Sequence, residues 1–157
     1  MAVVPIDGMV RASWLTALAV LASPTVAELN AGTAMQGFIL PDGLDITWTT
    51  GRVDTSNLGS TQGSGAAGRR TPDMSVGFHH DGVVDTAYNL MVYRAAGFWV
   101  FRYGVLATTA WTIGDKVETY PAMVGQTTQT KPAPDGTWDF TAPIFVTSDA
   151  NTRAVVA

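Results

Sequence analysis

The sequence contains no cysteine, and this absence excludes several kinds of chemistry. A chain without thiols has no disulfide framework, no thiol nucleophile and no thiolate metal site. Lysine is almost absent as well, with only Lys116 and Lys131, and the net charge is −4. Domains that bind duplex nucleic acid usually carry a basic patch. The composition therefore argues against a thiol enzyme and against a duplex-binding protein.

Charged residues of either sign are few. They make up 14% of the 157 residues, whereas hydrophobic residues make up 46%. Roughly 25% charged is usual for a globular domain. The length suits a single domain over residues 1–157, which buries about two thirds of its unfolded surface. So few charges on one domain predict that copies of the chain or other partners cover part of its surface.

A long hydrophobic run is also missing, and this bears on the N-terminus. Residues 9–23 (MVRASWLTALAVLAS) combine an arginine with a short apolar run, as a secretory signal does. However, Asp7 lies where a signal is basic, and the run is far shorter than the roughly 20 apolar residues of a membrane span. We predict instead that residues 1–22 form an ordered strand or an N-terminal arm.

What the chain does contain is a series of short strand patterns separated by turn residues. Residues 44–50 alternate between apolar and polar, and residues 73–80 do the same. Further strand patterns cover residues 98–104, residues 115–120 up to a break at the following proline, and a closing pair over residues 137–147.

Two segments carry helical signals. Residues 23–32 predict a brief helix with Ser23 as N-cap and Pro24 at its first position. Residues 85–96 predict a longer helix, capped by Asp85 and ended by the glycine that follows. Since most of the pattern is β with one substantial helix, we predict a mainly β fold, a β-sandwich or rolled barrel with one flanking helix.

Two polar stretches, residues 50–73 and 125–136, predict long loops, which ordered domains rarely keep without a use. The first contains a literal G-x-G-x-x-G at Gly63, Gly65 and Gly68. A dinucleotide site needs a strand before these glycines and a helix after them. Here polar residues precede them, a proline soon follows, and a P-loop lysine is missing. We predict no nucleotide and no other cofactor.

Within the first stretch, the glycine-rich loop over residues 59–73 leaves two interpretations open. It is either a solvated loop or a loop ordered against a neighbouring subunit, where Arg69 or Arg70 binds a carboxylate. Ordering a loop costs conformational entropy, so the second interpretation requires a large or multivalent contact.

No cluster of reactive residues emerges from the sequence. His79 and His80 are adjacent in a strand pattern, so they point to opposite faces and do not converge on one ion. There is no G-x-S-x-G elbow, and the spacing of the carboxylates does not indicate a catalytic pair. Most tryptophans lie in strand patterns, which favours core packing. We predict no catalytic residue and no metal site in a structural or interaction protein.

Three runs resemble major tail tube proteins of long-tailed bacteriophages, and most of all those of siphoviruses that infect actinobacteria. The runs are residues 24–61 (PTVAELNAGTAMQGFILPDGLDITWTTGRVDTSNLGST), residues 85–91 (DTAYNLM) and residues 114–147. The resemblance implies subunits that assemble into hexameric rings around a continuous inner β-barrel, and rings that stack into a conduit for the phage genome. It also implies a virion protein made in the host cytoplasm, with no membrane contact. The implied partners are further copies, the tape measure protein, the tail terminator and the distal tail protein.

In such a tube, double-stranded DNA must pass without specific binding. Because lysine and arginine bind phosphates, a neutral or acidic wall lets DNA slide. We therefore predict four residues that line the lumen: Asp45, Asp73, Ser75 and His79. Six further residues are predicted to contact other subunits or the next ring: Asp54, Thr55, Asn57, Arg69, Arg70 and Lys131.

Other functions stay open on the sequence. Tail terminators and some head–tail joining proteins share a related fold and form one terminal ring. A capsid decoration protein would also be mainly β and free of cysteine. A carbohydrate-binding module would need exposed aromatic residues on one face.

Overall fold

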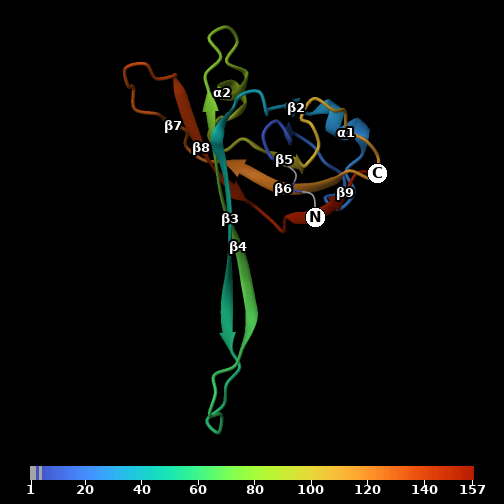
Figure 1. Ribbon diagram of the computed structural model, residues 1–157, viewed down its shortest axis with the longest axis vertical. Coiled ribbons are helices and arrows are strands. Elements are labelled where there is room, and N and C mark those ends of the chain that lie inside the picture. Colours follow the sequence, from blue (N-terminus) through green and yellow to red (C-terminus); the bar gives the residue numbers. More distant parts are fainter. Residues whose placement is uncertain (1–2, 4) are drawn as a thin grey trace.

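The computed structural model describes residue 3 and residues 5–157 of the chain (Figure 1). Within these residues it has nine strands and two short helices. In chain order they are β1 (Val10–Leu15), α1 (Val26–Ala31), β2 (Thr33–Ala34), β3 (Ile39–Asp54), β4 (Gly65–His79), α2 (Thr86–Leu90), β5 (Ala96–Tyr103), β6 (Lys116–Val124), β7 (Thr128–Gln129), β8 (Asp139–Val146) and β9 (Asn151–Val155). The predicted mainly β class is confirmed.

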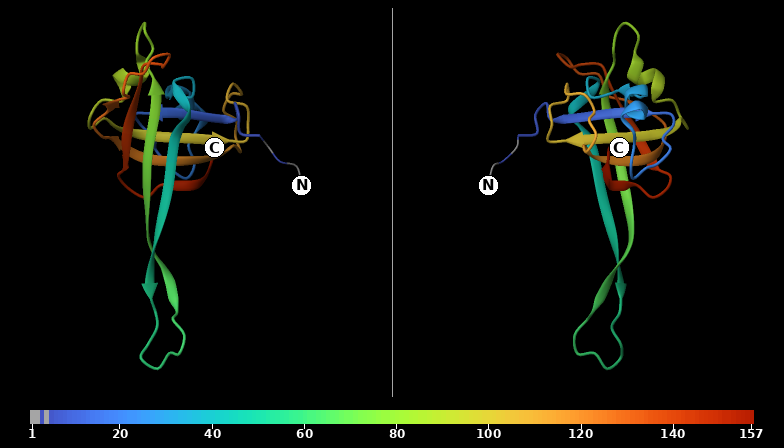
Figure 2. Two further views of the ribbon diagram at one scale, coloured as in Figure 1. Left: turned by 60° about the vertical axis from the view of Figure 1, so that its left-hand side comes forward. Right: turned by 90° about the vertical axis from the view of Figure 1, so that its right-hand side faces the viewer.

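All strand pairs are antiparallel and belong to one open sheet. Its order is β2-β1-β5-β6-β8-β4-β3, with β7 added to β8 and β9 added to β6. Strand β6 pairs with β5 along one edge, and its other edge is shared between β9 and β8. The sheet therefore turns a corner at β6 and β8, and β3 and β4 cross β5 and β6 at a large angle (Figures 1 and 2).

The main core lies where the two parts of the rolled sheet face each other. Aromatic rings fill it, with the ring centres of Phe78 and Phe140 5.1 Å apart and those of Trp99 and Phe101 5.4 Å apart. Trp14 and Trp99 are buried there, as the sequence predicts for most tryptophans. Trp138 is the exception, because 64% of its surface is exposed.

A second, smaller core covers the opposite face of β1, β5 and β6. Leu29 of α1 packs there with Leu15, Val100 and Trp111. The helix starts later than predicted, because Thr25 and not Ser23 is its N-cap. The Thr25 hydroxyl accepts a hydrogen bond from the Glu28 N–H, and the Glu28 carboxylate accepts one from the Thr25 N–H, so both orphan donors are satisfied.

The predicted helix over residues 85–96 is wrong in its length, since α2 has five residues. Asp85 has a left-handed backbone (φ 52°), and its carboxylate binds His80 rather than capping the helix. Arg94 is also left-handed (φ 66°) and donates its N–H to the Val124 carbonyl, which leads the chain into β5. Gly97 accordingly lies within β5 and does not end a helix.

Two further segments can be compared with their predictions. Strand β6 continues past Pro121, where the sequence predicted a break. This proline lies in the gap between Thr119, which pairs with β9, and Ala122, which pairs with β8. In the N-terminal segment the structure places β1, while residues 1, 2 and 4 lie outside the described residues. Among the described residues, no helix has the length and hydropathy to span a membrane.

Gly97 permits the close approach of β5 to β1, and this gives a stability prediction. A Cβ atom at this position would lie 2.5 Å from Cζ2 of Trp14 and 2.6 Å from the Leu15 carbonyl oxygen. We expect Gly97→Ala to lower the free energy of unfolding by about 1–3 kcal/mol, measured by urea denaturation. Gly82→Ala is the matched control, since a Cβ there meets nothing within 4 Å. Equal stabilities of the two variants would contradict the prediction.

Candidate assembly surfaces

Strands β3 and β4 form a long hairpin that projects far beyond the rest of the molecule (Figures 1 and 2). We call the part over residues 49–71 the arm. The prediction of a loop over residues 50–73 is wrong in its extent, because the strand register continues to the pair Asp54 and Gly65. The loop proper covers residues 55–64. Pairing persists through this polar sequence because backbone hydrogen bonds need no buried side chains.

The loop at the end of the arm is held by its own hydrogen bonds. The Asp54 carboxylate accepts from the N–H and hydroxyl of Ser56, and these bonds, the hydroxyl first, lower the pKa of Asp54. The Thr55 hydroxyl donates to the Ser64 hydroxyl, 3.0 Å away. Asn57 accepts from the Gly59 N–H at 3.0 Å. Three predicted contact residues, Asp54, Thr55 and Asn57, therefore lie together at the arm's end.

The other predicted contact residues lie elsewhere. Arg70 is on the arm, with its guanidinium carbon 5.2 Å from the centre of the Trp48 ring. Arg69 lies at the irregularity in register between Thr50 and Arg52, and its side chain is exposed. Lys131 is exposed and lies between β7 and β8. The β7–β8 segment is on the side of the molecule away from the arm (Figure 1). The six residues thus form no single patch.

The four predicted lumen residues, in contrast, share one face of the sheet. In the register, Asp45 is opposite Ser75, Asp73 is opposite Thr47, and His79 is opposite Asp139 on β8. Cross-strand partners lie on the same face, and so do alternate residues of one strand. We call this the polar face. Over residues 45–49 of β3 and residues 71–79 of β4 it carries no lysine or arginine.

The apolar side of the same strands confirms the alternation read from the sequence. Leu44, Ile46 and Trp48 are partly buried and pack against the main core. Asp45 and Thr47, between them, are exposed. The predicted alternation therefore separates a side that packs on the molecule from a polar side that faces away from it.

The two histidines turn to different partners. His79 Nδ1 lies 2.6 Å from Oδ1 of Asp139, whose pKa is lowered first by the Thr137 hydroxyl and then by His79. His80 Nδ1 lies 2.6 Å from Oδ2 of Asp85, and its ring stacks on Trp138 with centres 3.9 Å apart. Within the described residues, no three His, Asp or Glu side chains are grouped so as to hold a metal ion.

Strand β3 is the last strand of the sheet and also its longest, with 16 residues. In the part of the chain that the structure describes, its outer edge pairs with no other strand. The edge at the other end of the sheet, β2, has two residues. Proteins usually shorten, cover or charge their sheet edges, because an exposed edge pairs with other chains. An unpaired edge of this length offers the backbone N–H and C=O groups that pairing with another chain requires.

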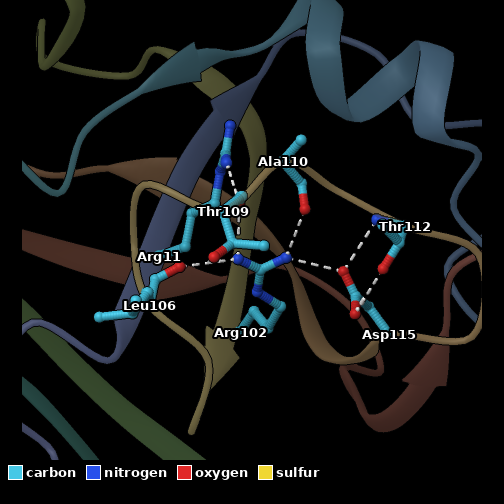
Figure 3. A network of polar contacts seen from close by, with 7 residues as sticks. All are labelled: Arg11, Arg102, Leu106, Thr109, Ala110, Thr112 and Asp115. Atoms are coloured by element: carbon cyan, nitrogen blue, oxygen red, sulfur yellow. Dashed lines mark hydrogen bonds and ion pairs between the residues drawn. The ribbon is translucent and has the colours of Figure 1, made fainter.

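A buried polar network supports the loop between β5 and β6 (Figure 3). Arg102 lies on β5 and is 1% exposed. Its guanidinium donates to Asp115 at 2.7 Å and to the carbonyls of Leu106, Thr109 and Ala110. The sequence does not mark this arginine, since one charge within an apolar strand pattern has no detectable partner before folding. The network holds residues 104–115 against the sheet.

Asp115 makes the network sensitive to acid. Burial alone would raise the pKa of Asp115, but hydrogen bonds from Thr112 and Arg102 outweigh burial and lower it. A carboxyl whose folded pKa lies below its unfolded value of about 3.9 adds stability above that pH. This stability is lost as the pH falls through the folded pKa.

We therefore expect the wild type to exceed Asp115→Asn in free energy of unfolding near neutral pH. The difference should shrink as the pH falls below about 4, because acid then protonates the wild-type carboxyl. Urea denaturation from pH 7 to pH 2.5 measures both curves. A difference that stays constant over this range would show that the charge of Asp115 adds no stability.

Comparison with known proteins bears on this geometry. A family model described as phage tail tube protein matches residues 1–157. No curated protein matches the chain. Among solved structures, the chain is similar to a chain of the anti-feeding prophage (AFP) baseplate, determined by cryo-EM and 6-fold symmetrised. The TM-score is 0.64 at 7% sequence identity, over 96% of each chain, so the likeness concerns the fold.

Proposed function

Because the chain belongs to the phage tail tube protein family and is thus a structural component of a phage tail, we propose that it is the major tail tube subunit. Six copies form a ring, and the rings stack into the conduit through which the genome leaves the virion. The resemblance in the order of segments further supports a siphovirus of actinobacteria. Its partners are then further copies, the tape measure protein, the tail terminator and the distal tail protein, and the subunit is made in the host cytoplasm.

The observation that carries the proposal is the unpaired outer edge of β3 in the described chain. In a ring, a strand of the neighbouring subunit covers this edge. Closing strands from six copies into one barrel removes the edges that would otherwise recruit further chains without limit. Low charge also suits this arrangement, because surface between subunits is depleted of charged residues.

Purified protein tests the proposal directly. We expect negative-stain electron microscopy to show rings or hollow tubes, and size-exclusion chromatography with light scattering to show mass rising with concentration. Single rings that never stack would favour a tail terminator or a joining protein. A monomer at every concentration would contradict self-assembly.

On the same proposal, the polar face lines the lumen. The face carries Asp45 and Asp73 and, over residues 45–49 and 71–79, no lysine or arginine that could bind phosphate. Double-stranded DNA then passes without specific binding, since no counterions are released at the wall.

Reversing these charges should slow the passage of DNA. Virions that carry Asp45→Lys with Asp73→Lys are expected to assemble but to release DNA about tenfold more slowly at 50 mM salt, and nearly normally above 200 mM, because salt weakens phosphate binding. Asp42→Lys with Asp149→Lys is the matched control, since both aspartates are exposed and lie off the polar face. Equal release rates for the two double variants would exclude the polar face from the lumen.

A further inference from the structure

The His80 side chain contacts three separate segments of the chain. It follows directly on β4, and its side chain is 2% exposed. Its Nδ1 atom lies 2.6 Å from Oδ2 of Asp85, which precedes α2, and its Nε2 atom lies 2.9 Å from Oε1 of Gln129 in β7. Its ring also stacks on Trp138, which precedes β8. The function proposed above uses none of these contacts.

Trp138 fixes the directions of the two hydrogen bonds to His80. An indole N–H only donates, and Nε1 of Trp138 lies 3.0 Å from the same Gln129 atom, so that atom is the carbonyl oxygen. Nε2 of His80 therefore donates to Gln129. Between Nδ1 and the carboxylate of Asp85 one hydrogen is shared, and the ring holds it because a carboxylic acid is the stronger acid. A ring that donates at both nitrogens is an imidazolium, since a neutral imidazole has one N–H.

The groups that face the His80 ring suit a cation. The carboxylate of Asp85 is bonded to it, and that carboxylate also accepts from the N–H of Asp81. The rings of Tyr88 and Phe140 have their centres 4.9 Å and 4.8 Å from that of His80. Asp139 of β8, which is paired with the preceding histidine, is a second carboxylate close by. Carboxylates and aromatic faces both stabilise a positive charge between them.

We propose that His80 is a proton-dependent clamp that fastens β7 to the start of α2. With both ring nitrogens protonated, it donates to Asp85 and to Gln129 at once. When one proton passes to water, the ring donates to only one of them and turns a lone pair toward the other acceptor, so that contact is lost. The clamp therefore holds at low pH and opens as the pH rises. Strand β7 has two residues paired with β8, so few other bonds replace the lost one.

The protonation of the ring can be measured directly, because the chain has two histidines. Solid-state NMR of protein with nitrogen-15 histidine reports on both rings, in free subunits and in assemblies alike, and His79→Gln assigns the signals. His79 also has a carboxylate partner but is 38% exposed. Between pH 6 and pH 9, His80 is expected to keep both ring hydrogens after His79 has lost one. A His80 ring that has one hydrogen throughout, or that changes together with His79, overturns the proposal.

Opening of the clamp is measured by hydrogen exchange with mass spectrometry over residues 81–88 and 126–138, with each rate divided by that of the unfolded chain at the same pH. When His80 loses its hydrogen, protection should fall by at least about tenfold, the usual effect of losing a hydrogen bond to a charged group. His80→Gln should show low protection at every pH, and the matched control His79→Gln should follow the wild type.

Strand β5 serves as the internal reference for these exchange measurements. Its protection should stay constant in all three proteins, which separates local opening from unfolding of the subunit. Wild-type protection over residues 81–88 and 126–138 that does not depend on pH, or the same profile in wild type and His80→Gln, would contradict the clamp. Because the clamp lies within one subunit, either result leaves the proposed tail tube function untouched.

Discussion

Removing the arm is expected to abolish stacking while leaving the subunit folded. Thr49 and Thr71 are cross-strand partners, so replacing residues 50–70 by an Asn-Gly turn closes a two-residue hairpin at their position. Neither core cluster contains a residue from 50–70. The midpoint of urea unfolding should therefore change little, with only the contact between Arg70 and Trp48 lost, which contributes about 0.5–1 kcal/mol at an exposed site.

Assembly should respond far more strongly than stability. If the arm supplies the contact between rings, the concentration needed to form tubes should rise at least about 100-fold, which corresponds to roughly 2.8 kcal/mol per contact. Light scattering against concentration measures this threshold. The control replaces Ser60, Thr61 and Gln62 by alanine and keeps the arm's length. Tubes that form at the wild-type threshold without the arm would show that stacking depends on other surfaces.

Several features of the fold could be predicted because they depend on local pattern. Alternation over residues 44–50 identified the side of β3 that packs on the core, with Leu44, Ile46 and Trp48 partly buried. The same alternation separated His79 from His80, which turn to Asp139 and Asp85. Side chains on a strand alternate between its two faces in any fold, so such predictions hold without knowledge of the strand order.

The arm could not be predicted, because composition reports burial and not pairing. Residues 50–73 are rich in glycine, serine and threonine, which is typical of a loop. In the structure the arm strands bury little on either side and are held by backbone bonds to each other. Leu58 is an isolated apolar residue within this polar run, and it is fully exposed in the loop at the arm's end. It is the one feature of the sequence that indicates a contact surface there.

The predicted length of the helix over residues 85–96 was wrong for a different reason. Its apolar spacing was helical, but tertiary contacts determined where it ended. The carboxylate of Asp85 binds His80 instead of capping the helix, and the N–H of Arg94 donates to the carbonyl of Val124. The partner of Asp85 is five residues away, at the start of the helix, but the partner of Arg94 is the last residue of β6 and distant in the sequence, so no local pattern reveals where the chain leaves the helix.

Arg102 is the position at which a single substitution should cost the most stability. Arg102→Met removes the charge and leaves the carboxylate of Asp115, 14% exposed, without its partner. The carbonyls of Leu106 and Ala110 lose their donor as well, and the carbonyl of Thr109 keeps only the donor from Arg11. Breaking one side of a buried ion pair typically costs about 3–5 kcal/mol. We expect a loss of this size in urea denaturation, against about 0.5 kcal/mol or less for Arg153→Met at an exposed site.

A double-mutant cycle with Asp115→Asn tests whether the loss belongs to the pair. Once the carboxylate of Asp115 is replaced, removing the guanidinium of Arg102 leaves no buried charge without a partner. The double variant should therefore be more stable than the sum of the single effects predicts, by about 0.5–3 kcal/mol. Additive losses would place the effect in packing instead. Arg102→Met should still assemble below its unfolding temperature, since none of the network's seven residues (Figure 3) is a predicted contact or lumen residue. The arm deletion and Arg102→Met thus separate the two demands on this chain: the first removes assembly from a folded subunit, and the second weakens folding in a subunit that can still assemble.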